Sequence, residues 1–455
     1  MSRHPMVVIS RIRAFSFHAG LALIFSSHPR MAAAEAPVEA RLEQLAEQNR
    51  RLEEQVRTQQ RQIEELRAMV SGLKGSGERQ DRAINDLRTQ VADEPAAVRV
   101  RSAAPGREVR VSGEAGFGFF RSGGAGASPN SEFHADDGKV FVEAAVMKNV
   151  YLFAGMELVT REASDEYFHV GDLYADFENI SDAWGGPTGL LNLRVGRFAI
   201  PFGEEYQRRN VVDNALITHS LSDIWGTDEG VEIFGALDRF SYVLAVQNGG
   251  HKTLRDYNSD KAVIARIGFD PTEWAHVSAS AMRTGDLTVA GDAFSEVWIG
   301  NGFFRALGPG ATTSTFSASL MQLDASLHWK GTDLRAAGGR ARFDDNDRSA
   351  DNSRRLRFYL IEVEQRLVGK WYGASRWSEL KAPGGYPLVG QGDFGTYMYR
   401  SPLTTDLRRL SVGGGYRFGP ALVWKAEYGF ERGHLVTGAR RDQEDLFSTE
   451  VALRF

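Results

Sequence analysis

The side chains best suited to chemistry in this sequence are basic residues in short segments where apolar and polar residues alternate. They occupy the polar positions of these segments. A guanidinium group donates two hydrogen bonds to one oxyanion and stays ionised at physiological pH. Alternate side chains of a strand share a face, so each such cation should lie opposite a run of apolar residues. Two further candidates are adjacent in an irregular segment. The candidate substrate-binding cations are Arg194, Arg208, Arg209, Arg266, Arg340, Arg342, Arg409, Arg417 and Lys425.

A structural role competes with solute binding at each of these positions. Acidic residues of similar polar segments could pair with the cations and brace a wall, among them Asp324, Glu427, Glu431 and Glu450. For any single arginine we expect such pairing more often than contact with a solute. The formal net charge of −5 also argues against an anion-attracting protein, unless acidic residues in external loops dominate that sum.

The sequence predicts no enzyme. Its histidines are scattered without an H-E-x-x-H pattern, and Gly413-Gly414-Gly415 lacks the Lys-Ser/Thr and helix of a phosphate loop. The chain has no cysteine, and its charge gives no basic balance for nucleic acid. Acidic clusters at 136–137 and 344–347 are typical of exposed loops. We therefore expect no catalytic residue, no cofactor, no metal and no nucleic acid partner.

Alternating segments fill residues 107–455. In the last of them Phe447, Val451 and Phe455 share one phase, and Ser448 and Glu450 the other. Each segment is about ten residues long, as transmembrane strands are. We predict tight connections at Lys148-Asn149, Asp238-Arg239, Asp270-Pro271, Gly331-Thr332 and Gly419-Pro420. Longer polar stretches alternate with them at 121–137, 249–259, 284–295, 344–354 and 379–404.

Short turns at one rim and long loops at the other predict an all-β, antiparallel transmembrane barrel. At some 20 residues per strand and connection, the segment 107–455 gives an even number near 16, which leaves an aqueous lumen. The alternative is a soluble β-sandwich or a solenoid array. So many long strands would then form several domains, and the sequence shows no linkers between them.

The first 106 residues have a different character. Basic residues, an apolar stretch and an Ala-x-Ala site predict a signal peptide over 1–34, whose removal takes four arginines and no acid and leaves a formal charge of −9. A sustained heptad repeat predicts a periplasmic coiled coil over 35–92, and hence an oligomer. Asn49 at a core position favours a dimer, whereas Gln59 is better tolerated in a trimer. Residues 93–106 are predicted to be a linker.

Two motifs resemble the phosphate-selective porin O/P family. They are LRVGRFAIPFGEE at 193–205 and GTDEGVEIFG at 226–235. The resemblance implies a trimeric barrel of about 16 strands with a loop folded into each lumen. Phe455 resembles the C-terminal aromatic residue that outer-membrane assembly machinery reads.

The residues between the two motifs independently suggest a constriction. Pro201 and Gly203 interrupt a strand, and 204–226 lacks alternation and is too long for a tight turn. Such a loop could fold inward, with Arg208-Arg209 and Asp213 offering opposed charges.

We therefore expect a porin in the outer membrane of a Gram-negative cell, embedded in its lipid, that lets small hydrophilic solutes diffuse passively. Small anions such as phosphate are the solutes the arginines favour. The alternative is an envelope-tethering protein whose barrel anchors the periplasmic coiled coil, with peptidoglycan as a partner. In either case the protein should be a homo-oligomer, with three copies if the resemblance holds.

Overall fold

The computed structural model describes residues 98–101, 108–160, 169–224, 226–249, 259–289, 303–304, 307, 312–347, 352–399 and 402–455. The chain divides into two units, Met1–Asn85 and Asp86–Phe455. All described residues belong to the second unit. The signal peptide predicted at 1–34 and the coiled coil predicted at 35–92 lie outside the described residues and stay predictions.

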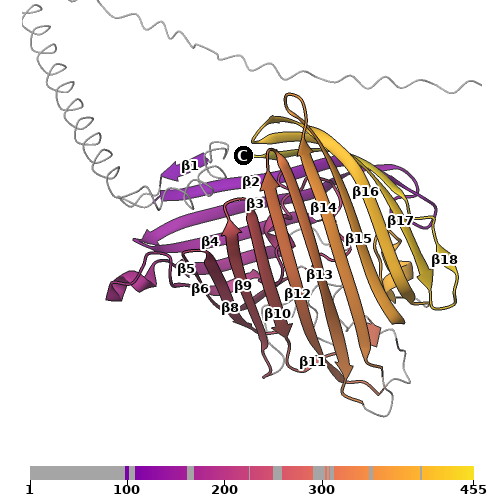
Figure 1. Cartoon of the computed structure of the whole chain (residues 1–455), viewed down its shortest axis with the longest axis horizontal. Coiled ribbons are helices and arrows are strands. Elements are labelled where there is room, and N and C mark those ends of the chain that lie inside the picture. Colours follow the sequence, from indigo (N-terminus) through magenta and orange to yellow (C-terminus); the bar gives the residue numbers. More distant parts are fainter. Residues whose placement is uncertain are drawn as a thin grey trace, which may run out of the picture. The chain divides into compact units, whose positions relative to one another are not determined.

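Sixteen antiparallel strands form a closed barrel, which confirms the predicted fold class (Figure 1). Each strand pairs with the next along the chain, and β19 closes the barrel by pairing with β2 from Leu446↔Ser122 to Arg454↔Glu114. The strands are β2 (Glu108–Ser122), β3 (Glu132–Met147), β4 (Val150–Thr160), β5 (His169–Phe177), β6 (Asn192–Ala199), β7 (Thr227–Leu237), β8 (Phe240–Gln247), β9 (Ala262–Thr272), β10 (Ala275–Arg283), β12 (Thr315–Trp329), β13 (Thr332–Asp345), β14 (Arg354–Arg366), β15 (Trp371–Tyr386), β16 (Thr404–Gly419), β17 (Leu422–Leu435) and β19 (Leu446–Arg454).

Short elements complete this unit: strands β1 (Val98–Arg101), β11 (Leu287–Thr288) and β18 (Arg440–Arg441), 3-10 helices η1 (Ile180–Trp184) and η2 (Glu205–Arg208), and helix α4 (Phe394–Tyr399). No helix in the described part of the chain is long and apolar enough to cross a membrane. Strand β1 lies within the predicted linker 93–106. It forms because β2 extends beyond the end of β19, and this open edge pairs with 98–101.

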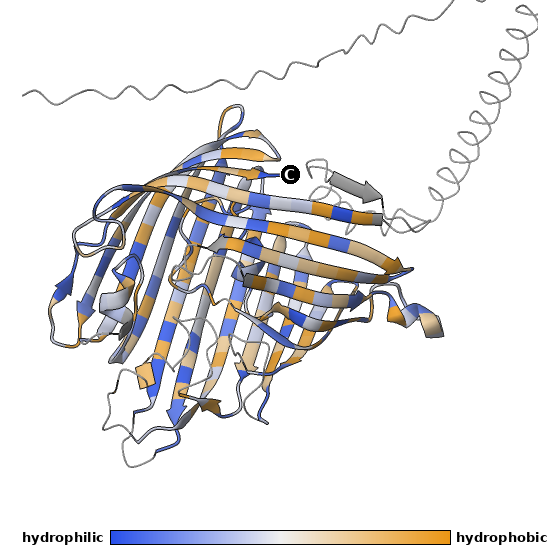
Figure 2. Ribbon diagram, turned by 180° about the vertical axis from the view of Figure 1, so that it is seen from behind, coloured by the Kyte–Doolittle hydropathy of each residue, from blue (hydrophilic) through white to orange (hydrophobic). Residues whose placement is uncertain are grey.

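Alternation along each strand separates an apolar outer face from a mixed inner face. On β14, Tyr359 and Ile361 are exposed on the outside, whereas Leu360 and Glu362 are buried on the inside. Hydrophobic and hydrophilic residues alternate along the strands in the same way in Figure 2. An apolar face turned outward is the reverse of a soluble β-sandwich, and it suits a barrel that contacts lipid.

The connections form one rim of mostly short turns and one of long loops. Turns at Lys148-Asn149 and Asp238-Arg239 lie where the sequence predicts them. Another turn is Lys330-Gly331 rather than Gly331-Thr332, and both of its residues have positive φ (49° and 80°), as a type I′ hairpin requires.

Two more predicted turns are displaced, because in each case the preceding strand continues further. Asp270-Pro271 still belongs to β9, so the turn is 273–274, and Gly419 ends β16, so the turn is 420–421. At the other rim, β3 already begins at Glu132 and β15 continues to Tyr386. The loops predicted at 121–137 and 379–404 are therefore shorter than expected.

The lumen is not uniformly polar. Toward the long-loop rim, inward side chains of β6 and of β8 to β16 form a buried apolar cluster with residues of the connecting loops. Its aromatic centre is Phe303, Phe316, Phe343 and Tyr386, with the Phe343 and Tyr386 rings stacked at 5.3 Å. This cluster fills one side of the lumen and leaves polar side chains to line the rest.

Candidate functional site

The long connection between β6 and β7 folds into the barrel as the sequence predicts; we call its described residues, 200–224 and 226, the inward loop. It turns inward at Gly203, where φ is 71° and a Cβ would lie 2.6 Å from the Gln322 amide nitrogen. The Gly203 amide donates to Ser280 Oγ at 3.1 Å, and Arg266 donates to the Gly203 carbonyl at 2.9 Å. These contacts cross the lumen to β9, β10 and β12.

The second half of the inward loop is tied to the wall formed by β15, β16 and β17. Lys425 donates to the carbonyls of Val211 (2.7 Å) and Leu216 (3.1 Å). Arg409 donates to the His219 carbonyl at 3.0 Å, and Arg417 to that of Val212 at 3.3 Å. Three candidate cations therefore satisfy loop carbonyls that would otherwise be unpaired inside the barrel.

Acidic neighbours neutralise the same three cations. Lys425 pairs with Glu450 at 2.9 Å, Arg409 with Glu431 at 2.7 Å, and Arg417 with Glu364 at 3.2 Å. The Lys425 and Glu450 side chains are almost fully buried. Such cations brace the wall, and the first two are too buried to meet a solute.

Glu427 also holds the inward loop, but as a hydrogen-bond acceptor rather than as a donor. Its carboxylate accepts hydrogen bonds from the amides of Ile217 (2.6 Å) and Thr218 (2.8 Å) and from the Thr218 hydroxyl (2.5 Å). On β15, Arg376 donates to the Thr218 carbonyl at 2.5 Å and to Asn214 Oδ1 at 2.7 Å. The loop is thus fixed by charged groups on both its donors and its acceptors.

A cavity of roughly 280 Å³ lies between the inward loop and the wall of β12 to β15. On its basic side, Arg335 and Arg376 share the carboxylate of Glu362, at 3.0 and 2.5 Å. Arg208 of the inward loop lines the same cavity and is exposed. Among the described residues it forms no hydrogen bond or ion pair, so its guanidinium is available to a solute. Arg209 instead pairs with Asp223 at 2.6 Å.

The cavity's acidic side comprises Glu204, Glu205 and Asp324. Burial alone would raise the pKa of Glu204, but hydrogen bonding to His276 and the charge of Arg266 outweigh burial and lower it. The pKa of Glu205 is raised, first by burial and then by the negative charge of Asp223. Acidic and basic groups therefore face each other across this space.

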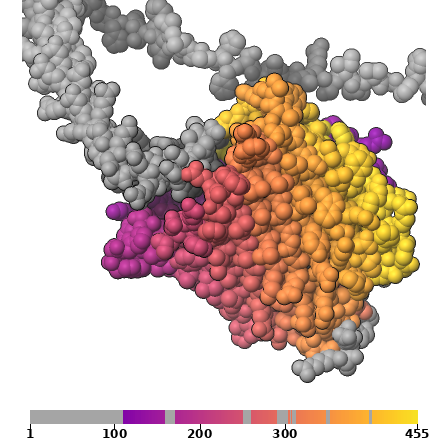
Figure 3. All heavy atoms as spheres, in the orientation of Figure 1, coloured from indigo at the N-terminus to yellow at the C-terminus, as the bar shows by residue number. Residues whose placement is uncertain are grey.

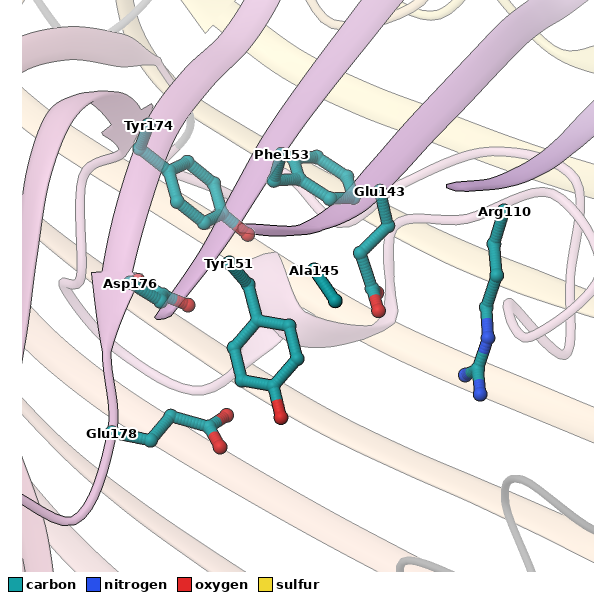
Figure 4. Close-up of a pocket in the computed structure, with 8 residues that line it drawn as sticks. All are labelled: Arg110, Glu143, Ala145, Tyr151, Phe153, Tyr174, Asp176 and Glu178. Atoms are coloured by element: carbon teal, nitrogen blue, oxygen red, sulfur yellow. The ribbon is translucent and has the colours of Figure 1, made fainter. Parts of the chain in front are cut away.

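A second cavity, of roughly 460 Å³, lies near the short-turn rim (Figure 4). Arg110, Glu143, Tyr151 and Glu178 point into it from β2, β3, β4 and the end of β5. Arg194 lies beside this cavity, but Asp176 binds it at 2.8 Å and its guanidinium stacks 4.1 Å from the Tyr174 ring centre. Arg194 is therefore an inward cation that is held by an acid and an aromatic ring.

Two predicted cations point the wrong way. Arg340 and Arg342 lie on the outer face of β13, while Ala341 and Phe343 point inward. The prediction assumed that polar side chains face the lumen at every height. Near the long-loop rim the lumen contains the apolar cluster, so polarity is reversed there. Arg335 and Arg376 also face the lumen, although they were not among the predicted cations. Each alternates along its strand with apolar residues, Leu334 and Ala336 beside Arg335 and Trp377 beside Arg376, and this alternation is the signal that could have indicated them.

The remaining candidates lie inside the barrel or on its inward loop. They are Arg194, Arg208, Arg209, Arg266, Arg409, Arg417 and Lys425. Of these, Arg208 is the one exposed in the cavity beside the inward loop without a partner among the described residues.

The fold defines a class, the 16-stranded barrels with a loop folded into the lumen. Among solved structures, the outer-membrane channel DcaP of Acinetobacter baumannii superposes with a TM-score of 0.53 at 10% identity, covering 78% of this chain and 99% of that one. OmpT, an outer-membrane protein of Vibrio cholerae, gives 0.51 at 12% identity, covering 79% and 100%. These likenesses show the fold alone. No protein-family profile and no curated protein sequence matches the chain.

Proposed function

We propose that the protein is an outer-membrane porin through which small hydrophilic solutes diffuse passively. The observation that carries this proposal is a closed 16-stranded barrel with an apolar outer face and a charged loop folded into its lumen. A solute passing such a constriction exchanges water for polar side chains, and this exchange sets the barrier. The fold shared with the channel DcaP supports the proposal.

We further propose a preference for small anions, phosphate among them, with Arg208 as the residue that a solute contacts. Three arginines, Arg208, Arg335 and Arg376, lie around the single carboxylate of Glu362. Across the cavity, Glu204 lies 3.6 Å from Arg266, and Asp324 accepts a hydrogen bond from Gln322 at 2.7 Å. Glu204 thus has a cationic partner, whereas the exposed guanidinium of Arg208 has none among the described residues.

Planar-bilayer recording tests both parts. We expect stepwise conductance and, in a KCl gradient, a reversal potential that indicates anion preference. One charge about 5 Å from the solute path in a water-like medium contributes about 1 kcal/mol, so Arg208→Ala should lower the anion-to-cation permeability ratio about two- to five-fold. Arg283→Ala removes an equally exposed cation from the outer face of β10 and should leave the ratio unchanged.

The outcomes separate the two parts of the proposal. Absence of stepwise conductance from folded protein would contradict the porin function. Conductance with cation preference, or a ratio that Arg208→Ala does not lower, would contradict the anion site and leave the pore.

We also propose that residues 35–92 assemble the protein into a homo-oligomer, a trimer by the family resemblance, on the periplasmic side. The heptad repeat supports this proposal. Deleting 35–92 should lower the mass of the detergent-solubilised complex while conductance per barrel persists. If only attachment of the barrel to the cell wall is lost, tethering is the main task of the segment.

A further inference from the structure

Five basic side chains gather on the outer face of the barrel, near its long-loop rim. They are Arg340 and Arg342 of β13, Arg355 and Arg357 of β14, and Lys381 of β15, which we call the outer basic patch. All five are exposed. Their strands, β13 to β15, face the viewer in Figures 1 and 3. The five side chains point away from the lumen, because they alternate along these strands with buried inward residues. Solutes inside the pore therefore do not meet them.

The strand register places like charges directly abreast. Arg340 is paired across the sheet with Arg357, and Arg357 with Lys381. Two residues nearer the rim, Arg342 lies opposite Arg355. Opposed side chains on neighbouring strands have Cβ atoms roughly 4.5–5.5 Å apart, and like charges at that separation destabilise the sheet. Asp406 of β16 lies opposite Lys381 at the end of the first row. The four arginines have no acid directly opposite them, so a counter-anion would relieve the repulsion within both rows.

The described part of the chain supplies only a few acids to this patch. Asp344 pairs with Arg342 at 2.6 Å, and Glu379 with Lys381 at 3.3 Å. Arg340 contacts only the sulfur of Met321, at 3.3 Å, among the described residues. No described acidic side chain forms an ion pair with Arg340, Arg355 or Arg357. Three of the five positive charges thus have no acidic partner among the described residues, and a ligand from outside the chain can bind them.

The patch also lies at a defined height. Arg340 comes eight residues after Thr332, the start of β13, which is about 26 Å along the strand and roughly 20 Å along the axis of a tilted barrel. Below it the outer face is apolar, with Leu323 67% and Ile361 51% exposed, and Tyr359 at the boundary. Apolar bands of such barrels are about 25 Å tall. Arg340 thus lies near the upper edge of such a band, and its long side chain can extend its charge to the headgroup region.

We propose that the outer basic patch binds the phosphate groups of a phosphorylated glycolipid, lipid A, in the surface-facing leaflet. This inference rests on the outer-membrane location proposed above. Planar guanidinium groups bind phosphate in a bidentate manner, and two rows of them match a headgroup that carries more than one phosphate. Acyl chains of the same lipid then cover the apolar surface around Leu323 and Ile361. The lipid thereby relieves the repulsion within each row.

Binding of fluorescent lipid A to the full-length protein in non-ionic detergent tests the proposal. The triple variant Arg340→Gln, Arg357→Gln, Lys381→Gln should weaken binding at least ten-fold. A matched control, Lys330→Gln, Arg366→Gln, Lys370→Gln, removes the same charge from the opposite rim of the same strands and should change binding less than two-fold. Without lipid, the triple variant should unfold at a higher temperature than the wild type, because it loses like-charge pairs.

Other probes distinguish the source of the phosphate. Dephosphorylated lipid A should bind at least ten-fold more weakly, and millimolar inorganic phosphate should not displace the lipid. Equal binding by the triple variant and the wild type would overturn the proposal, as would equal binding of dephosphorylated lipid A. Displacement by inorganic phosphate would overturn it too, since the patch would then be a site for the free ion. Conductance is recorded separately, so failure of the pore and failure of the lipid site are distinguishable.

Discussion

Replacing Glu427 should release the inward loop without opening the barrel. In Glu427→Ala, the amides of Ile217 and Thr218 and the Thr218 hydroxyl lose their shared acceptor in a buried setting. Each unsatisfied donor costs about 1–3 kcal/mol, so with partial hydration we expect a loss of roughly 3–6 kcal/mol. Glu427 is not needed for the backbone pairing of β16 and β17, so the cost should be confined mostly to the loop.

Hydrogen exchange measured by mass spectrometry on a peptide covering 211–221 reports this loss. Because 1.4 kcal/mol corresponds to a factor of ten, the protection of these amides should fall about 10²- to 10⁴-fold. Glu427→Gln is the matched control. Its amide oxygen still accepts the two N–H groups and its NH₂ donates to the Thr218 hydroxyl, so only charge assistance is lost and protection should fall about ten-fold or less. If Glu427→Ala leaves protection within three-fold of the wild type in a folded barrel, the carboxylate does not hold the loop.

Two further predictions concern the strands and the loop. Gly196→Ala should sharply reduce the fraction of folded, heat-modifiable barrel. At a φ of 136°, the added Cβ would lie 2.3 Å from the Leu173 carbonyl oxygen. The control Gly419→Ala should fold normally, because no atom lies within 4 Å of its added Cβ. Because the pKa of Glu205 is raised in the folded protein, ionisation of its carboxyl group should destabilise the loop. This loss of stability is absent below the unfolded-state pKa near 4.5 and complete above the folded-state pKa. Intrinsic-rate-corrected exchange protection of 204–221 should therefore decrease as pH rises through that window, and Glu205→Gln should remove the decrease; an equal slope in both proteins would contradict the assignment.

Strand number, strand phase and the inward loop could be predicted from the sequence because each has a local signal. Alternation along 422–431 and 446–455 places every side chain of those segments on the face that the structure shows. Pro201 and Gly203 likewise indicate where the strand ends and the inward loop begins. Turn positions were predicted less accurately, three residues early at Asp270-Pro271 and one residue early at Gly419-Pro420, because a strand extends by a few residues at little cost.

The roles of the cations could not be predicted, because they depend on partners far apart in the sequence. Lys425 meets Val211 and Glu450 only when the barrel closes around the loop. Arg340 was assigned to the lumen because nothing local shows that an apolar cluster occupies the barrel at that height. The two-residue alternation of a strand specifies that neighbouring side chains lie on opposite faces. Which of the two faces carries the polar residues inside the barrel depends on how distant loops pack there.

The distribution of arginines argues that position, rather than number, governs what this pore prefers. Cations between the loop and the wall are neutralised by Glu364, Glu431 and Glu450, so a solute senses little of their charge. Cations on the outer face are directed at lipid. Arg208 is left exposed in the lumen, beside two arginines that share one carboxylate. A negative formal charge of the whole chain is therefore compatible with a pore that favours anions, and the preference should be weak because it depends on so few exposed charges.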